Sequence, residues 1–119
     1  MKTIMVVDDE KDIRNTIKTA LENNGYNVIT AINGEDCLRQ LPKYKGKIDL
    51  ILMDIMMPGM PVKDVVPQIK DIKLSYLSVV NISSDQKKEL TKQKNVVDFI
   101  QKPFDVPAFI KQIRKIVGK

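Results

Sequence analysis

Five short segments rich in Val, Ile, Leu and Met alternate with longer segments of helical period along the chain. This alternation constrains the fold more than any other feature, because repeated βα units form a parallel sheet with right-handed crossovers and helices on both faces. The first and third segments are almost continuously apolar, as central strands of a parallel sheet are. We therefore expect an α/β fold. The predicted strands are residues 3–7, 26–31, 48–53, 77–82 and 96–100.

The intervening segments carry apolar residues at spacings of three and four, which predicts amphipathic helices. The first helix should end near Gly25, and the last has the clearest apolar stripe, from Val106 to Val117. The fourth, over residues 85–94, offers only Leu90 as a strong apolar anchor, so we expect it to be loosely held. The first three helices are marked by Ile13, Ile17, Ala20 and Leu21, by Leu38 and Leu41, and by Val65, Val66, Ile69 and Ile72.

Length and hydropathy favour one domain over residues 1–119. With 119 residues, 43% of them hydrophobic, the chain can build one core and is too short for two. No apolar run approaches the roughly 20 residues of a membrane span, and residues 1–3 lead into the first strand without a signal-peptide core. We therefore expect a cytoplasmic protein that makes no membrane contact.

Composition excludes several classes of chemistry. The chain has no histidine and one cysteine, Cys37, so Ser-His-Asp and Cys-His hydrolysis and zinc sites with histidine ligands are ruled out. Cys37 lies in a helical pattern and is expected to be an ordinary helix residue. Carboxylate, hydroxyl and lysine chemistry remain.

Polar side chains follow four of the predicted strands. Asp8 and Asp9 follow the first, Asp54 the third, Ser83 the fourth and Lys102 the fifth. In open α/β sheets, ligands bind in the crevice beyond the carboxyl ends of the strands. We therefore expect three carboxylates, a hydroxyl and a lysine to converge at one edge of the sheet.

Each of these residues also has a purely structural interpretation. The acidic residues 8–10 could cap the first helix, and Ser83 with Gln86 fits a capping box for the fourth. Lys102 could be a surface lysine before a turn proline. Asp54 is harder to explain in this way, because burying a lone carboxylate costs several kcal/mol unless it is paired, hydrogen-bonded or bound to a metal.

As a set, the residues at the strand ends suit phosphoryl transfer. Clustered carboxylates bind hard cations, and Mg²⁺ usually takes one or two of them while keeping waters and phosphate oxygens. An aspartate such as Asp54 can attack phosphorus to form an acyl phosphate, with the metal, Lys102 and a hydroxyl neutralising the transferring group.

The net charge of +5 lies entirely in the last third of the chain. Residues 84–119 hold nine Lys or Arg and four Asp or Glu, whereas residues 1–83 hold eleven of each. The aromatic residues there are three phenylalanines, and no Arg-rich or Gly-rich stretch accompanies them. This pattern favours a solvated face or a partner protein with an acidic surface, and argues against direct nucleic-acid binding.

Four motifs, in chain order, resemble those of the receiver domain of two-component response regulators. They are VVDDE after the first strand, LMDIMMPG after the third, VNIS closing the fourth and FIQKPF after the fifth. The resemblance covers essentially the whole chain. It implies a flavodoxin-like (βα)₅ three-layer sandwich with a parallel five-stranded sheet in the order 2-1-3-4-5.

The resemblance also implies functions for particular residues. Asp54 would accept a phosphoryl group from a phosphohistidine on a sensor histidine kinase, and Mg²⁺ would bind Asp8, Asp9, Asp54 and the main-chain carbonyl of Met56. Such a protein is a signalling receiver and catalyses only its own phosphorylation and dephosphorylation.

The resemblance further implies which residues would contact the phosphoryl group and pass the signal to a partner protein. Ser83 would hydrogen-bond the phosphoryl group and Lys102 would pair with it, while Phe99 corresponds to the family's switch aromatic. Movement of Ser83 and Phe99 would remodel the face formed by the fourth helix, fifth strand and fifth helix. The output would be contact with a downstream protein, by a monomer or a phosphorylation-dependent dimer; if the chain is complete, it is a stand-alone receiver.

Three positions depart from the family pattern. Pro61 and Val62 replace the usual Asp-Gly, and Ser84 replaces a smaller residue.

Three other functions are alternatives to a receiver. A haloacid dehalogenase-type phosphohydrolase needs a second carboxylate where Met56 stands. A flavin-binding electron carrier needs a Ser/Thr/Gly-rich phosphate cradle, but the loop after the first strand is acidic. A receiver-like interaction module that is never phosphorylated is the main alternative.

Overall fold

The computed structural model of the chain describes residues 1–44, 46–69, 71–78, 83–101 and 105–118. Five strands form one sheet in the order β2-β1-β3-β4-β5, and every neighbouring pair is parallel. The strands are β1 (Thr3–Val7), β2 (Asn27–Ala31), β3 (Leu50–Asp54), β4 (Lys73–Ser78) and β5 (Val96–Gln101). The predicted flavodoxin-like (βα)₅ fold, with strand order 2-1-3-4-5, is confirmed.

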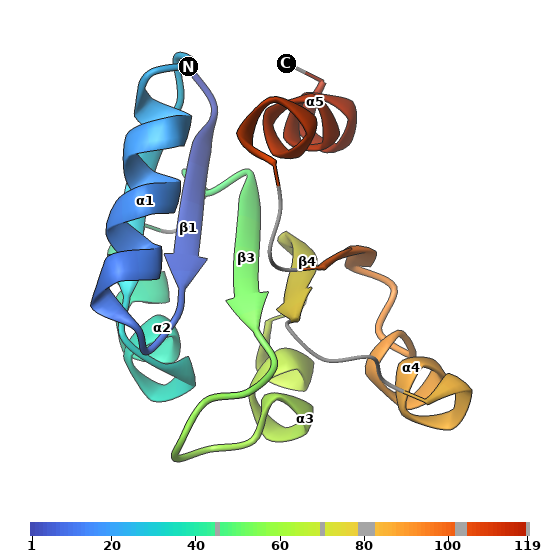
Figure 1. Cartoon of the computed structure of the whole chain (residues 1–119). Helices are drawn as coiled ribbons and strands as arrows, with labels where there is room; N and C mark the ends of the chain where they lie inside the picture. The colour runs from blue at the N-terminus through green and yellow to red at the C-terminus, as the bar shows by residue number, and fades with distance from the viewer. Residues whose placement is uncertain (45, 70, 79–82, 102–104, 119) are drawn as a thin grey trace.

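Helices cover both faces of this sheet. They are α1 (Lys11–Glu22), α2 (Gly34–Gln40), α3 (Val62–Val65), α4 (Ser84–Leu90) and α5 (Val106–Val117), with 3₁₀ turns at Leu41–Tyr44 and Val66–Gln68. In Figure 1 the arrowheads of β1 and β3 lie side by side at one end of the sheet, and the two termini lie at the other.

The alternation of side chains along each strand builds two cores. On β3, Leu50 and Leu52 pack with residues of α1 and α5, whereas Ile51 and Met53 pack against α2 and α3. All four side chains are fully buried, so β3 is the centre of the sandwich. The fold therefore has three layers, as expected.

The stripe predicted for α5 is confirmed from Phe109 to Val117, whereas Val106 at its start is 40% exposed. Phe109, Ile110 and Ile113 are buried against the sheet, on the same side as Ile17 and Leu21 of α1. Asp105 caps α5 by accepting a hydrogen bond from the amide of Ala108 at 3.2 Å.

The prediction for the fourth strand was wrong at its start. Residues 77–82 were expected, but β4 begins at Lys73, and residues 79–82 lie outside the described part of the chain. Ser75 and the exposed Lys73 hide the strand from a search for apolar runs. The strand forms because Leu74 and Tyr76 pack on one face and Leu77 on the other.

The third helix is also shorter than predicted. A stripe through Val65, Val66, Ile69 and Ile72 was expected, but the α-helix ends at Val65 and a 3₁₀ turn over Val66–Gln68 follows. Pro67 has no amide hydrogen to continue the helical ladder. Val65, Val66 and Ile69 are nevertheless buried, so their assignment to the core is right.

Candidate functional site

Asp54 is the last residue of β3, where four fully buried apolar residues give way to a carboxylate. Its side chain is only 3% exposed. It belongs to the face that carries Leu50 and Leu52, and its register partner on β4 is Leu77. The amide of Met56 donates a 3.2 Å hydrogen bond to Oδ1 of Asp54, which holds the start of the following loop against the carboxylate.

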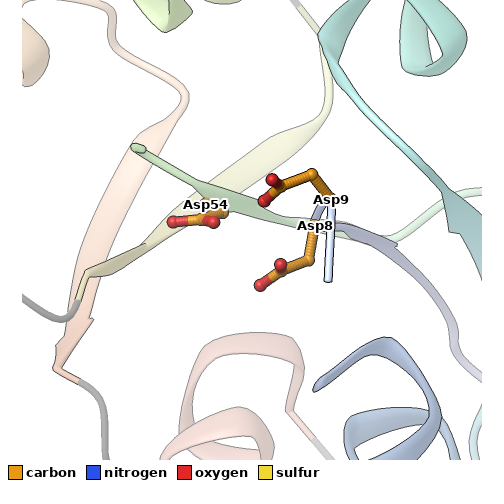
Figure 2. A group of neighbouring side chains, drawn as sticks. All are labelled: Asp8, Asp9 and Asp54. Atoms are coloured by element: carbon orange, nitrogen blue, oxygen red, sulfur yellow. The ribbon is translucent and has the colours of Figure 1, made fainter. Parts of the chain in front are cut away.

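Asp8 and Asp9 lie directly after β1, the neighbour of β3 in the sheet. Asp8 is fully buried, whereas Asp9 is exposed. Asp8, Asp9 and Asp54 each offer a carboxylate oxygen, and these oxygens all lie within 4.8 Å of one another. Figure 2 shows the three side chains gathered beyond the ends of their two strands. The predicted convergence of the three carboxylates is therefore present.

The hydrogen bonds of Asp8 differ from those of a helix cap. The amide of Glu10 donates to Oδ1 of Asp8 at 2.9 Å, and Nη1 of Arg14 donates to the main-chain oxygen of Asp8 at 2.7 Å. Glu10 occupies the N-cap position of α1, and its side chain makes no capping hydrogen bond. The capping interpretation therefore fails for Glu10, and the loop instead fixes the orientation of the Asp8 carboxylate.

The donor set fits a small hard cation. In octahedral Mg²⁺ coordination the oxygens lie about 2.0–2.1 Å from the metal, so adjacent ligands are about 2.9 Å apart and opposite ligands about 4.2 Å apart. The oxygens of Asp8, Asp9 and Asp54, which lie within 4.8 Å of one another, would draw closer together around such an ion. Asp8 and Asp54 are buried, so a cation would also relieve the repulsion between their carboxylates and that of the exposed Asp9.

Met56 is well placed for the ligand function that the family resemblance implies, since its backbone amide already contacts the Asp54 carboxylate. Its side chain is 61% exposed and points away from the core. The assignment of its carbonyl as a ligand stays a prediction.

Ser83 forms the N-cap of α4. Its hydroxyl accepts a hydrogen bond from the amide of Gln86 at 3.2 Å, and its own amide donates to Oε1 of Gln86 at 3.2 Å. The capping box that offered a structural interpretation of Ser83 is therefore confirmed. The contact between Ser83 and a phosphoryl group stays a prediction.

A second serine at this end of the sheet was missed by the sequence analysis. Ser78 ends the described part of β4, one residue after Leu77, the register partner of Asp54, and it is 5% exposed. The late start predicted for β4 placed Ser78 inside the strand and drew attention to Ser83 instead. Lys102, the predicted phosphoryl partner after β5, lies outside the described residues.

Phe99 lies on β5 and is half-buried between the sheet and α4. Its ring is 5.1 Å from that of Tyr76, tilted by 39°. The ammonium of Lys87 on α4 lies 5.2 Å from the Phe99 ring centroid, at a cation–π distance. The predicted switch aromatic thus contacts α4 directly.

Cys37 is fully buried in α2, as expected of an ordinary helix residue. Burial, followed by the negative charge of Asp36, raises the pKa of its thiol from 9.0 to about 12. A thiol that stays protonated at neutral pH is a poor nucleophile and metal ligand.

Within the described ranges, no helix is both long enough and apolar enough to cross a bilayer.

Comparison with known proteins gives a consistent result. The family model described as "Response regulator receiver domain" matches residues 4–114. The chain is 35% identical to the alkaline phosphatase synthesis transcriptional regulatory protein PhoP of Bacillus subtilis, over 94% of this chain and 48% of that protein. It is 31% identical to the transcriptional regulatory protein CpxR of Escherichia coli, over 100% of this chain and 50% of that protein. The chain thus spans about half the length of these curated relatives.

Solved structures of response regulators superimpose on most of this chain. A CheY-like response regulator receiver domain protein from Methanospirillum hungatei superimposes with a TM-score of 0.83 at 34% identity, covering 98% of this chain and 94% of that one. The response regulator TrrA from Thermotoga maritima, crystallised with Mg²⁺ and BeF, gives a TM-score of 0.79 at 32% identity, covering 98% and 99% of the two chains.

Proposed function

Because this chain belongs to the response regulator receiver domain family, we propose that it accepts a phosphoryl group on Asp54 from a sensor histidine kinase, in a Mg²⁺-dependent reaction. The observation that carries the proposal is the meeting of Asp8, Asp9 and Asp54 oxygens within 4.8 Å at the ends of β1 and β3. The Mg²⁺-bound relative TrrA supports the choice of metal.

The proposed reaction uses Asp54 as the nucleophile. A carboxylate oxygen of Asp54 attacks the phosphorus of a phosphohistidine, the P–N bond breaks, and the imidazole nitrogen leaves with the bonding electrons and takes up a proton. The product is an acyl phosphate on Asp54. The attacking carboxylate carries no proton that has to be removed, so the step needs no general base.

The other groups would bind and orient the phosphoryl group. Asp8, Asp9, Asp54 and the carbonyl of Met56 would hold Mg²⁺, which neutralises negative charge on the transferring group. Lys102 would pair with the phosphoryl oxygens, and Ser83 would donate a hydrogen bond to them. The Ser83 hydroxyl accepts from the Gln86 amide and keeps one O–H to donate, so a hydrogen bond to the phosphoryl group would replace only its 3.4 Å contact with Oε1 of Gln86. The site would thereby be coupled to the start of α4.

The output would pass through the face formed by α4, β5 and α5. Phe99 contacts both Tyr76 of the sheet and Lys87 of α4, so a change in its rotamer would disturb the position of α4. The basic charge of residues 84–119 suits a downstream protein with an acidic surface. The relatives PhoP and CpxR are transcriptional regulators of about twice this length, and their activities are not assigned to this chain.

The chain would not act as an enzyme on other substrates, and would catalyse only the gain and loss of its own phosphoryl group. A receiver-like interaction module that is never phosphorylated is the second candidate. The two candidates differ in whether the three carboxylates bind a metal and react.

The test is intact mass after incubation with phosphoramidate or acetyl phosphate, with and without Mg²⁺, for the wild type and Asp54→Asn. We expect a Mg²⁺-dependent gain of about 80 Da, one phosphoryl group, that is absent from Asp54→Asn. An equal gain in the variant would exclude Asp54 as the acceptor. No gain in the wild type, including after incubation with phosphorylated histidine kinases, would favour the interaction module.

A further inference from the structure

Arg14 of α1 binds the main chain at the acidic site. Its Nη1 donates a 2.7 Å hydrogen bond to the carbonyl of Asp8, six residues earlier. Figure 1 shows α1 running back along β1, with its start close to the arrowhead of that strand. Long side chains on a helix point toward its N-terminus, so Arg14 reaches back over the first turn of α1. Arg14 is therefore placed to act on the loop that carries Asp8 and Asp9.

At least three hydrogen bonds hold Asp8. Its amide donates to the carbonyl of Ala31 at 3.2 Å, which carries the pairing of β1 with β2 beyond the end of β1. Its Oδ1 accepts from the amide of Glu10 at 2.9 Å, and its carbonyl accepts from Arg14. Of these partners only Arg14 contributes a side chain, so a substitution of Arg14 removes this hydrogen bond and leaves the other two donor–acceptor pairs in the chain.

The loop before α1 has few other restraints. Glu10 at the N-cap makes no capping hydrogen bond with its side chain, and residues 9–12 are exposed. A segment with few buried contacts moves at low free-energy cost. Arg14 is half-buried, and its amide donates to the carbonyl of Glu10 at 3.0 Å, so its backbone belongs to the helix. Its side chain thus ties a weakly restrained loop to a regular element.

Arg14 could affect a bound Mg²⁺ in two ways that have opposite signs. Among the described residues no carboxylate lies within ion-pair distance of its guanidinium, which binds the main chain instead. The hydrogen bond orients a segment that carries metal ligands, and its loss would weaken Mg²⁺ binding. The positive charge repels a cation nearby, so loss of the charge alone would tighten Mg²⁺ binding. The sign of the change therefore separates the two effects.

We propose that Arg14 is a positioning residue of the metal site, whose hydrogen bond to the Asp8 carbonyl holds Asp8 and Asp9 where their carboxylates can bind Mg²⁺. This oxygen belongs to the planar peptide unit that joins Asp8 to Asp9, so fixing it restrains both residues. The inference rests on the Mg²⁺ site of the proposed function. It adds to that site a residue that contacts neither the ion nor the phosphoryl group.

The test compares Mg²⁺ binding by the wild type, Arg14→Lys and Arg14→Met. MgCl₂ is titrated at constant ionic strength into each ¹⁵N-labelled full chain, freed of metal beforehand, while the amide signals of residues 8–10 and 54–56 are followed. Arg14→Met removes the donor and the charge, whereas Arg14→Lys keeps the charge and a shorter donor. We expect the wild type to bind most tightly, Arg14→Lys less tightly and Arg14→Met about tenfold less tightly than the wild type. Charge alone predicts that Arg14→Met binds most tightly.

Lys11→Met is the matched control, because Lys11 is exposed at the first position of α1 and carries the same charge as Arg14. It should bind Mg²⁺ at least as tightly as the wild type. A second readout needs no metal. The Glu10 amide, which donates to the Asp8 carboxylate, should exchange with water faster in metal-free Arg14→Met than in the wild type or Lys11→Met. Well-dispersed spectra would show that all variants are folded.

Three results would overturn the proposal while the wild type still binds Mg²⁺: binding by Arg14→Met as tight as that of the wild type, an equal weakening in Lys11→Met, or an unchanged exchange rate of the Glu10 amide in Arg14→Met. The proposed function would survive each of them. If the wild type itself binds no Mg²⁺, the metal site of the proposed function fails and this inference fails with it. The wild-type titration therefore distinguishes the two failures.

Discussion

The hydroxyl of Tyr76 donates a 3.1 Å hydrogen bond to the main-chain carbonyl of Leu90, the last residue of α4. Tyr76 is 1% exposed on β4, so this bond joins the buried sheet to a helix with no fully buried residue. Burial raises the pKa of the Tyr76 hydroxyl from 10.0 to about 12, which keeps it protonated as a donor at neutral pH. A buried tyrosine thus helps to hold the end of α4 against the sheet.

Replacing Tyr76 with phenylalanine should loosen α4. The variant keeps the ring that packs on Phe99 but leaves the Leu90 carbonyl without this donor, at a cost of about 1 kcal/mol. Hydrogen exchange should accelerate in α4 while that of α1 stays close to the wild type.

Tyr26→Phe is the matched control, because the Tyr26 hydroxyl is buried with no hydrogen-bond partner among the described residues. It should leave α4 exchange unchanged. Equal acceleration in both variants would mean that the Tyr76 hydrogen bond does not hold α4.

Replacing Ser75 with alanine should not destabilise the protein. Ser75 is fully buried, and within the described ranges its hydroxyl has no hydrogen-bond partner. Removing a buried polar group without a partner relieves a desolvation penalty, so unfolding free energy in urea should be unchanged or higher by up to about 1 kcal/mol.

The same chemical change at Ser83 should have the opposite sign. Ser83→Ala removes the N-cap of α4 and should cost about 1 kcal/mol. A large loss of stability in Ser75→Ala would show that its hydroxyl does have a partner in solution.

Asp9→Asn should stabilise the metal-free protein and weaken its response to Mg²⁺. The substitution removes one of three carboxylates whose oxygens meet within 4.8 Å, and it does so at the exposed member, where the least packing is disturbed. Thermal unfolding in EDTA should therefore occur at a higher temperature than in the wild type.

Magnesium gives the second readout of this prediction. At ten times its dissociation constant, Mg²⁺ should stabilise the wild type by about 1.4 kcal/mol and stabilise Asp9→Asn much less. Equal stabilisation of the two proteins would place the metal elsewhere.

The stability of the fold should fall at high pH partly through Cys37. Burial raises the pKa of this thiol from 9.0 to about 12, so above pH 9 the unfolded chain loses the proton while the folded protein keeps it. Deprotonation therefore stabilises the unfolded state relative to the native state, and the free energy of unfolding falls between about pH 9 and pH 12.

Urea unfolding of the wild type and Cys37→Ala as a function of pH measures this effect. The variant should be less stable at pH 7 because a buried side chain is lost, but its stability should fall less steeply above pH 9. Parallel profiles would mean that the thiol ionises equally in both states.

Much of the fold and of the acidic site could be predicted from the sequence. The alternation of apolar and helical segments determined the βα order, and Asp8, Asp9 and Asp54 could be assigned to one edge because parallel strands end at the same side of a sheet. Ser83 was more ambiguous, since it could contact a phosphoryl group or, with Gln86 three residues later, cap a helix. The structure contains the helix cap, and the phosphoryl contact stays a prediction.

Other features depended on contacts between distant segments. β4 starts at Lys73 because its register against β3 pairs Ile51 with Leu74, and hydrogen bonds between strands are invisible to a local apolar pattern. The same pairing places Ser78 one residue after Leu77, the register partner of Asp54, whereas the sequence analysis had placed Ser78 near the start of the strand.

The sequence by itself determined which residues can do chemistry and at which edge of the sheet most of them lie, because the βα order implies parallel strands and the side-chain period of a strand is local. Only the tertiary structure decided what holds α4, namely the bond from Tyr76 to Leu90 and the contact of Lys87 with Phe99. These pairs are far apart in the chain or span two elements, and they form only once the sheet has been assembled and the helix placed beside it.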